Sequence, residues 1–305
     1  MSAQAISPSR RQRRRFAPTI PLLAAIPAIA LLVLLMVVPL CSFVIRSLTG
    51  IDGEFSWGSY QEIFTEPRYR TALFNSVWLA IASTALALLI ALPAALHLAR
   101  LRGRTRTVVD AVLTFPLSLP GVVIGFFIIV MFGRSGLAQA AMTALTGEPG
   151  LVLAYAMPGL LLAYLYFQLP RVLGTLRGAA EALDPDLVTV ARTLGASRTR
   201  VTFTVVLPAL KPAIFAATAL AIASSLGAYG TVAALSEGFR VLPLDIAEQG
   251  TMLQNTRLAG AMSIVLALVS LISTLLNDAA ERHMRRGAKP AAATAVAAAT
   301  GGRTS

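Results

Sequence analysis

The sequence predicts an all-α, polytopic membrane protein with six transmembrane helices. Of its 305 residues, 56% are hydrophobic and only 13% are charged, about half the charged fraction of a typical soluble domain. Six stretches of at least 20 residues contain no Asp, Glu, Lys or Arg, and they lie between Arg15 and Arg46, Arg70 and Arg100, Asp110 and Arg134, Glu148 and Arg171, Lys211 and Glu237, and Arg257 and Asp278. About 20 apolar helical residues span the roughly 30 Å hydrocarbon core of a bilayer. A soluble fold of this size would have too little polar surface to cover six such stretches.

The basic residues predict the orientation in the membrane. Six spans place both termini on one side, and 20 of the 26 Lys and Arg residues fall on that side, with 6 on the other. Basic residues are enriched in cytoplasmic segments, so both termini are expected in the cytoplasm. The net charge of +12 therefore reflects topology and disfavours a nucleic-acid partner. We expect a basic cytoplasmic arm over residues 1–21, a six-helix domain over 22–276 with a long cytoplasmic loop at 171–211, and a tail over 277–305 that is disordered after 287.

The predicted spans lack the groups that ion-coupled carriers and membrane enzymes use. None of the six stretches contains a charged residue, whereas proton-exchanging carriers keep ionisable side chains at depth. The two histidines and single cysteine form no metal-binding pattern. We therefore predict no catalytic, cofactor-binding or metal-binding residue in this chain. An ion-gradient-driven secondary transporter and a membrane anchor without transport activity remain the alternative classes.

Two of the predicted spans carry helix-breaking residues. The third contains FPLSLPGVVIG, and the fifth contains SSLGAYG. Such breaks are tolerated in the membrane where protein or a water-filled cavity satisfies the freed backbone groups. The candidates for the wall of a pathway are therefore Pro116, Pro120, Gly121, Ser224, Ser225, Gly227, Tyr229 and Gly230. For any single glycine, close packing of two helices is the alternative explanation.

The loop between the fourth and fifth spans predicts a short amphipathic helix. Asp184 suits an N-cap, Pro185 the first helical position, and Asp186 the positive end of the helix dipole. Apolar residues then recur at i, i+3, i+4 and i+7, namely Leu187, Val190, Ala191 and Leu194. Gly195 suits a left-handed C-cap. A second helical stretch is expected to begin at Ser197 and to end by Pro208.

The polar face of this helix distinguishes between two possible roles, lying on the lipid surface and docking onto a partner protein. A helix lying on the lipid surface typically has a basic polar face, but here the polar residues are of mixed sign: Asp186, Thr189, Arg192 and Thr193. The composition favours docking into a groove of a partner protein.

The segment Ala191 to Pro208, ARTLGASRTRVTFTVVLP, resembles the cytoplasmic loop signature of permease subunits of type I binding-protein-dependent ABC importers. That signature reads Glu-Ala-Ala, three residues, Gly, nine residues, Ile-X-Leu-Pro. The glycine, leucine and proline match at Gly195, Leu207 and Pro208. Thr189 stands where the signature has Glu, and Asp186 lies on a similar face and could substitute for it. With the six-span topology, the resemblance covers Leu22 to Leu276.

The resemblance implies a coupling helix that docks onto a dimer of ATP-binding cassette subunits. The residues implied in this contact are Asp186, Leu187, Thr189, Val190, Ala191, Arg192, Leu194, Gly195, Ala196, Ser197 and Pro208. ATP and Mg²⁺ would be bound by the partner, because this chain has no Gly-X-X-X-X-Gly-Lys-Ser/Thr loop. The other implied partners are a second permease subunit, identical or different, and an extracytoplasmic solute-binding protein. The chain itself would reside in the inner membrane.

The resemblance leaves several substrates open. The string LGAYG at Leu226 to Gly230 resembles Leu-Gly-Glu-Tyr-Gly of sulfate and molybdate permeases, with Ala228 in place of Glu. The layout also resembles permeases for polyamines, iron(III), thiamine and aminoethylphosphonate. The expected cargo is a small charged nutrient.

Overall fold

The computed structural model describes residues 19–50, 52–101, 103–148, 150, 152–235 and 238–300, with side chains described between residues 25 and 283. These parts of the chain form helices and their connections, with one isolated β-bridge between Thr49 and Phe55. The basic residues predicted to form a cytoplasmic arm, up to residue 18, lie outside the described residues.

Six helical segments are long and apolar enough to cross a membrane, and this confirms the predicted number. They are built from α1 (Thr19–Ser47), α3 (Pro67–Leu98), α5 (Gly121–Phe132) with α6 (Leu137–Thr146), α7 (Met157–Glu181), α9 (Arg198–Val201) with η2 (Thr202–Val206) and α10 (Leu207–Leu226), and α13 (Thr256–Thr300). The remaining elements are α2 (Gly58–Thr65), α4 (Gly103–Thr114), η1 (Phe115–Ser118), α8 (Pro185–Thr193), α11 (Tyr229–Leu235), α12 (Leu242–Ala247) and η3 (Glu248–Met252).

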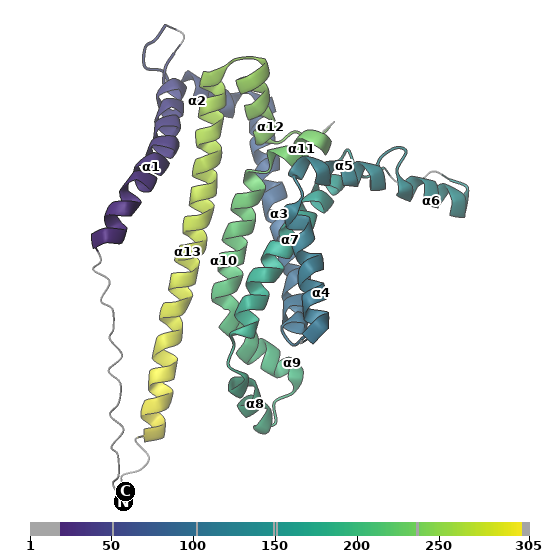
Figure 1. Ribbon diagram of the computed structural model, residues 1–305, viewed down its shortest axis with the longest axis vertical. Coiled ribbons are helices and arrows are strands. Elements are labelled where there is room, and N and C mark those ends of the chain that lie inside the picture. Colours follow the sequence, from purple (N-terminus) through teal and green to yellow (C-terminus); the bar gives the residue numbers. More distant parts are fainter. Residues whose placement is uncertain are drawn as a thin grey trace, which may run out of the picture.

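Helices α3, α7 and α10 form the centre of the molecule (Figure 1). Small residues of α3 pack here against larger apolar residues of α7, as Ala91 and Ala95 do in the same cluster as Val172 and Leu176. Because alanines allow helix backbones to approach closely, they favour tight packing where lipid provides no hydrophobic driving force. Helix α8 lies at one end of this bundle, and α2 and α12 lie at the opposite end (Figure 1). We call these the α8 end and the α12 end.

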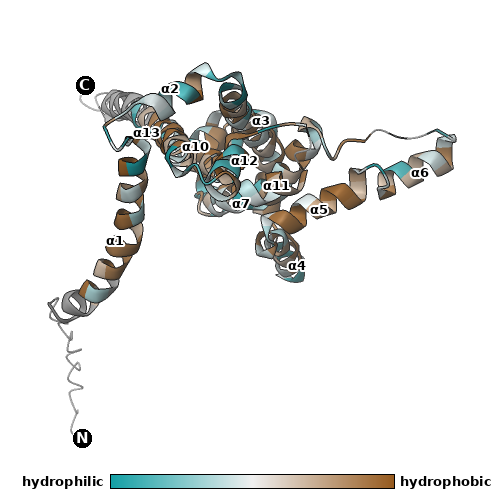
Figure 2. Cartoon of the chain, turned by 90° about the horizontal axis from the view of Figure 1, so that it is seen from above, coloured by the Kyte–Doolittle hydropathy of each residue, from teal (hydrophilic) through white to brown (hydrophobic). Residues whose placement is uncertain are grey.

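Two segments extend away from the central helices. Figure 2 shows α1 leaving on one side and α5 with α6 leaving on another. Helix α1 touches α13 near Gly260, where an added Cβ would lie 3.2 Å from the Phe43 carbonyl oxygen. The described apolar side chains of α1 are otherwise exposed. Within this chain, most of the α1 surface is therefore available to lipid or to another subunit.

The third span departs from the sequence prediction. An apolar helix was expected between Asp110 and Arg134, but α4 ends at Thr114 and α5 begins only at Gly121. Pro116 and Pro120 lie in this break, where they cannot donate the backbone hydrogen bonds of a continuous helix. The third apolar segment is instead Gly121–Thr146, which includes a turn between α5 and α6.

Two helices also extend beyond the predicted limits. Helix α7 runs past Arg171 to Glu181, because a charged residue that reaches the end of a span does not stop the helix. Helix α13 also continues over residues 287–300, within the tail that was predicted to be disordered. This segment is rich in alanine, the residue with the highest helix propensity.

The close approach of α5 to α11 leads to a test of packing. An added Cβ at Gly125 would lie 2.5 Å from the Ala234 Cβ atom, whereas at Gly174, in α7, it would meet nothing within 4 Å. We expect Gly125→Ala to destabilise the protein by about 1–3 kcal/mol through overpacking. Gly174→Ala should be neutral or stabilising by up to about 1 kcal/mol. Thermal unfolding of the two purified variants measures the difference, and equal midpoints would contradict the α5–α11 contact.

Candidate functional site

Helix α8 forms where the sequence predicted it. Asp184 is the N-cap, and its carboxylate accepts a hydrogen bond of 2.9 Å from the backbone N–H of Asp186. Pro185 is the first helical residue. Gly195 follows the helix with a φ of +84°, and its N–H donates to the Arg192 carbonyl at 3.0 Å. The left-handed conformation explains why glycine occupies this position.

The faces of α8 have different environments. Val188 and Ala191 pack inward, against the cluster formed by Val201, Val206 and Leu210. Three apolar residues point away from the bundle and are 50%, 58% and 82% exposed: Leu187, Val190 and Leu194. We call these three residues the apolar ridge. Ala191, which the sequence pattern grouped with them, is half-buried. Exposed leucines and valines in a row on a short, capped helix form a surface suited to a protein partner.

The residues after α8 connect it directly to the fifth span. The Ser197 hydroxyl caps α9 by accepting a hydrogen bond of 3.3 Å from the Arg200 N–H. The predicted end of this stretch at Pro208 was wrong, because a π-helical turn, η2, leads into α10 without interruption. A proline ring clashes with the carbonyl four residues earlier in a regular helix, and in η2 the Leu207 N–H donates instead to the Thr202 carbonyl, five residues earlier. Of the other predicted contact residues, Asp186, Thr189, Arg192 and Pro208 are exposed, and Ala196 is half-buried in the inner cluster.

An ionic network fixes the helix end that precedes α8. Arg177 is buried and pairs with Asp110 of α4, and its Nε atom lies 2.9 Å from a Glu181 carboxylate oxygen. The other oxygen of Glu181 lies 2.9 Å from Arg106. A buried guanidinium requires such partners, because an unpaired charge away from water is strongly destabilising. The network therefore holds α4 against the end of α7, next to the α8 N-cap.

The two predicted helix breaks both occur, and the structure brings them together. Helix α10 ends at Leu226 and α11 begins at Tyr229, while α5 begins at Gly121 after the proline break. An added Cβ at Gly121 would lie 2.8 Å from the Thr231 hydroxyl oxygen, and one at Gly230 would lie 3.2 Å from the Val122 side chain. The close-packing explanation therefore applies to these two glycines. Their part in a pathway stays a prediction.

A neutral polar cluster lies in the centre of the bundle, beneath the second break. The Gln168 amide nitrogen donates to the Ser83 hydroxyl at 2.9 Å and also to the Ser225 hydroxyl, and all three residues are buried. Among the described residues, the Gln168 carbonyl oxygen and the Thr84 hydroxyl have no hydrogen-bond partner. The Tyr164 hydroxyl forms a long contact of 3.5 Å with the Ala228 carbonyl, which the break leaves outside a helix. We call Gln168, Ser83, Thr84 and Ser225 the neutral polar cluster.

Sequence reasoning identified Ser225 and missed the rest of this cluster. The other predicted pathway residues are not part of it: Ser224 is half-buried, Gly227 and Tyr229 are exposed, and Pro116 and Pro120 lie before α5. Gln168 is the only amide side chain in the charge-free stretch between Glu148 and Arg171. A lone amide in an apolar span is the signal that would have found it.

A second ionic network closes the α12 end. Asp245 is fully buried, and one of its oxygens accepts hydrogen bonds from Arg68 at 2.7 Å and from Arg240 at 2.8 Å. Glu248 accepts from Arg68 at 2.5 Å and from Arg240 at 2.8 Å. The hydrogen bond from Arg240, supported by the charges of both guanidiniums, lowers the pKa of Glu248. These contacts tie α12 and η3 to the beginning of α3.

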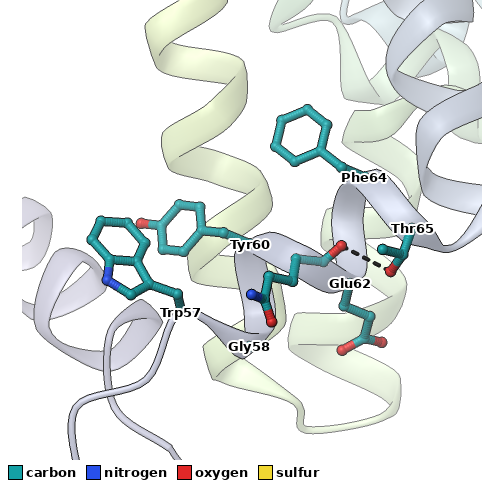
Figure 3. Close-up of a pocket in the computed structure, with 7 residues that line it drawn as sticks. Trp57, Gly58, Tyr60, Glu62, Phe64 and Thr65 are labelled. Atoms are coloured by element: carbon teal, nitrogen blue, oxygen red, sulfur yellow. Dashed lines mark hydrogen bonds between the residues drawn. The ribbon is translucent and has the colours of Figure 1, made fainter.

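Aromatic residues lie at the α12 end of the molecule, on α2 and at its N-cap. Trp57, Tyr60 and Phe64 line an open hollow of about 680 Å³, and Figure 3 shows their side chains. The Trp57 and Tyr60 rings lie 5.4 Å apart, and the Tyr60 hydroxyl is 2.8 Å from the Ser47 hydroxyl at the end of α1. Tryptophan and tyrosine are enriched where transmembrane helices meet the membrane surface. The position of α2 is therefore consistent with a helix lying at that surface.

Six apolar segments, two broken helices that meet and a projecting amphipathic helix define a multi-pass helical membrane protein. Comparison with known proteins agrees with this class. Residues 87–286 match the family described as "Binding-protein-dependent transport system inner membrane component". The chain belongs to this family, and it is therefore a permease subunit of an ABC importer and a multi-pass inner-membrane protein.

Several curated relatives are named as permeases of molybdenum or sulfate transport systems. The molybdenum transport system permease protein ModB of Mycobacterium tuberculosis is 36% identical over 237 residues, which cover 76% of this chain and 88% of that protein. ModB of Escherichia coli K12 is 36% identical over 172 residues, covering 55% and 72%. The sulfate transport system permease protein CysT of the same strain is 30% identical over 203 residues, covering 65% and 69%.

A solved structure supports the fold. The crystal structure of a bacterial alginate ABC transporter in complex with an alginate pentasaccharide-bound periplasmic protein contains a chain that superposes with a TM-score of 0.74. The match covers 86% of this chain and 94% of that chain at 16% sequence identity. At this level of identity, the likeness shows the fold and nothing about the cargo.

The N-cap of α8 can be tested by substitution. We expect Asp184→Ala to destabilise α8 by about 1 kcal/mol, because the first helical N–H groups lose their acceptor. Amide exchange in residues 186–193 should then be about five-fold faster. Asp186→Ala is the matched control, since Asp186 contributes its backbone N–H to the cap. Hydrogen exchange that is equal in the two variants would argue against Asp184 as the N-cap.

The α12 network predicts a pH-dependent stability. A carboxyl group whose pKa is lowered in the folded protein stabilises the fold at pH values above its ordinary pKa of 4.5. This stabilisation is lost as the pH falls through the lowered pKa. Wild type should therefore unfold at a higher temperature than Arg240→Gln near pH 7, and the difference should shrink as the pH falls below about 4.5. Unfolding midpoints between pH 7 and pH 3 measure this effect. A difference that does not change with pH would contradict the assigned pairing.

Proposed function

We propose that this chain is the membrane-spanning subunit of an ATP-driven importer for a small tetrahedral oxyanion of the molybdate or sulfate type. The observation that carries the proposal is the apolar ridge, which is exposed on a capped helix in a chain of the ABC importer permease family. The relatives named as molybdenum and sulfate permeases support this cargo class.

We assign the α8 end to the cytoplasm, together with both termini. The loop that carries α8 contains Arg192, Arg198 and Arg200, whereas Arg240 is the one basic residue between α11 and α13. This asymmetry follows the enrichment of basic residues in cytoplasmic loops. The α12 end then faces the extracytoplasmic solute-binding protein that delivers the cargo.

The apolar ridge is proposed to dock into a groove of an ATP-binding cassette subunit. ATP and Mg²⁺ are held there, and this chain has no catalytic or nucleotide-binding residues in the proposal. When two such subunits close on ATP, they move α8. The inner face of α8 packs on Val206 and Leu210, at the beginning of the fifth span. Motion of α8 is therefore passed to α10, whose other end is the break beside α5 and α11.

A second permease subunit is proposed to complete the pathway. Helix α1 and the α5–α6 segment extend from the bundle and expose apolar side chains, for example Leu35 and Phe126. These surfaces suit either lipid or a second permease, identical or different in sequence. The neutral polar cluster would lie close to the pathway. Hydroxyl and amide groups can bind an anion briefly, whereas a fixed positive charge at depth would hold it too tightly for rapid release.

Uptake measurements test the cargo. The chain is produced with its ATP-binding subunit and solute-binding protein in cells that lack their own molybdate and sulfate importers. We expect ATP-dependent accumulation of labelled molybdate or sulfate, and no accumulation of labelled spermidine. Uptake of spermidine in place of both oxyanions would contradict the proposed cargo, while uptake that persists in ATP-depleted cells would contradict the ATP-driven mechanism.

The ridge itself is tested by Leu194→Asp. A charge at the centre of an apolar contact should weaken binding of the ATP-binding subunit by at least about 2 kcal/mol, or roughly 30-fold, and should abolish uptake. Thr193→Asp, which adds the same charge beside the ridge, is the matched control and should retain most binding. Co-purification of the ATP-binding subunit with each variant provides the measurement. Equal retention by both variants would exclude the ridge as the docking surface.

A further inference from the structure

A cavity of about 520 Å³ lies between α8 and the bundle, and no step of the proposed transport mechanism uses it. Its walls come from the ends of α3 and α7, from α8 and from the segment that begins α9, for example Leu96, Ala180, Val188 and Val201. Its volume is within the usual range for small-molecule sites. The cavity is therefore large enough for a small ligand at the base of the projecting helix.

The cavity uses the face of α8 opposite the apolar ridge. Pro185, Val188, Thr189 and Arg192 line it. Their spacing of i, i+3, i+4 and i+7 places them on one side of the helix. The ridge residues occupy the other side. A ligand in the cavity and a protein on the ridge can therefore contact α8 at the same time.

Three arginines from three different elements line this cavity: Arg100 after α3, Arg192 on α8 and Arg198 on α9. Among the described residues, none of their side chains has a hydrogen-bond or ion-pair partner. The two acidic residues of the lining are already engaged. Glu181 pairs with Arg106 and Arg177, and Asp184 caps α8. The cavity thus has an excess of unpaired positive charge on concave walls.

We propose that this cavity binds a tetrahedral phosphate-class anion, either free in solution or as the phosphate of an anionic lipid headgroup. Guanidinium groups bind such anions through paired, charge-assisted hydrogen bonds. A bound anion would connect Arg192 on α8 to Arg100 and Arg198 on the bundle. It would therefore restrain the projecting helix from the side opposite the ridge. This site is independent of the proposed cargo, and its failure would leave the permease assignment unchanged.

Two pairs of substitutions separate the effect of residues that line the cavity from the effect of nearby residues outside it. Arg198→Gln removes a charge from the lining, and Arg200→Gln removes one from the same short helix outside it. Thr189→Glu places a carboxylate in the cavity, where it should pair with the arginines and exclude an added anion. Thr193→Glu adds the same charge to α8 outside the lining. Thr189 and Thr193 are both exposed, so neither change disturbs packing.

Equilibrium dialysis of the purified full chain, in a neutral detergent with radiolabelled inorganic phosphate, measures binding of the free anion. We expect saturable binding that Arg198→Gln and Thr189→Glu weaken about ten-fold or more, which corresponds to one lost charge-assisted contact. Arg200→Gln and Thr193→Glu should change it by less than about two-fold. Equal losses in all four variants, or phosphate binding that no variant alters, would overturn a site in the cavity.

A second measurement distinguishes the lipid source. Native mass spectrometry is performed after reconstitution with either phosphatidylglycerol or phosphatidylcholine. If the lipid headgroup is the ligand, wild type and Thr193→Glu should each retain one bound phosphatidylglycerol, and Thr189→Glu and Arg198→Gln should lose it. In that case equilibrium dialysis should show no saturable binding of inorganic phosphate. The proposal is wrong if neither phosphate nor phosphatidylglycerol binds in a way that depends on residues 189 and 198.

Discussion

The exclusion of unpaired charge from the hydrocarbon core is the constraint on which this structure depends. Charged side chains that are buried occur at the two ends of the bundle, and each has partners there. Arg177 is held by Asp110 and Glu181 at one end, and Asp245 is held by Arg68 and Arg240 at the other. Between them, the described polar groups of the core are neutral, as in the cluster around Gln168. The ends are therefore fixed by ionic contacts, while the middle is joined by weaker ones.

In this arrangement α8 has two opposite faces, and the proposed coupling role depends on both. Its inner side packs on Val206 and Leu210 and so connects it to the fifth span. Its apolar ridge is exposed on the opposite face, and Val188 of the inner side also lines the cavity that contains the arginines. The Arg177 network keeps α4 and α7 in place at the base of α8. In the proposed mechanism, a force applied to the ridge would pass to α10 and to the break at Gly227, where the helix can change direction without breaking regular backbone hydrogen bonds.

Local features were predictable from the sequence, and contacts between distant residues were not. The cap at Asp184, the left-handed Gly195 and the breaks at Pro116 and Gly227 depend on neighbouring residues, and all are present. The pairing of Arg68 with Asp245 joins residues 177 positions apart, which no spacing rule predicts. Ala191 faces inward because the fold covers one side of its helix, whereas the sequence pattern grouped it with the exposed ridge. The helix continues through Pro208 because of a π turn that the sequence pattern does not predict.

The central claim is that the apolar ridge contacts an ATP-binding subunit, and site-directed cross-linking tests it most directly. Cys41 is the only cysteine, so a Cys41→Ser background carrying Val190→Cys presents one thiol on the ridge. In membranes that contain the ATP-binding subunit, a short photoactivatable cross-linker on this thiol is expected to join the two chains. The same probe at Thr204, which is exposed on η2 away from the ridge, should give little product. Efficient cross-linking from position 204 and none from position 190 would contradict the account.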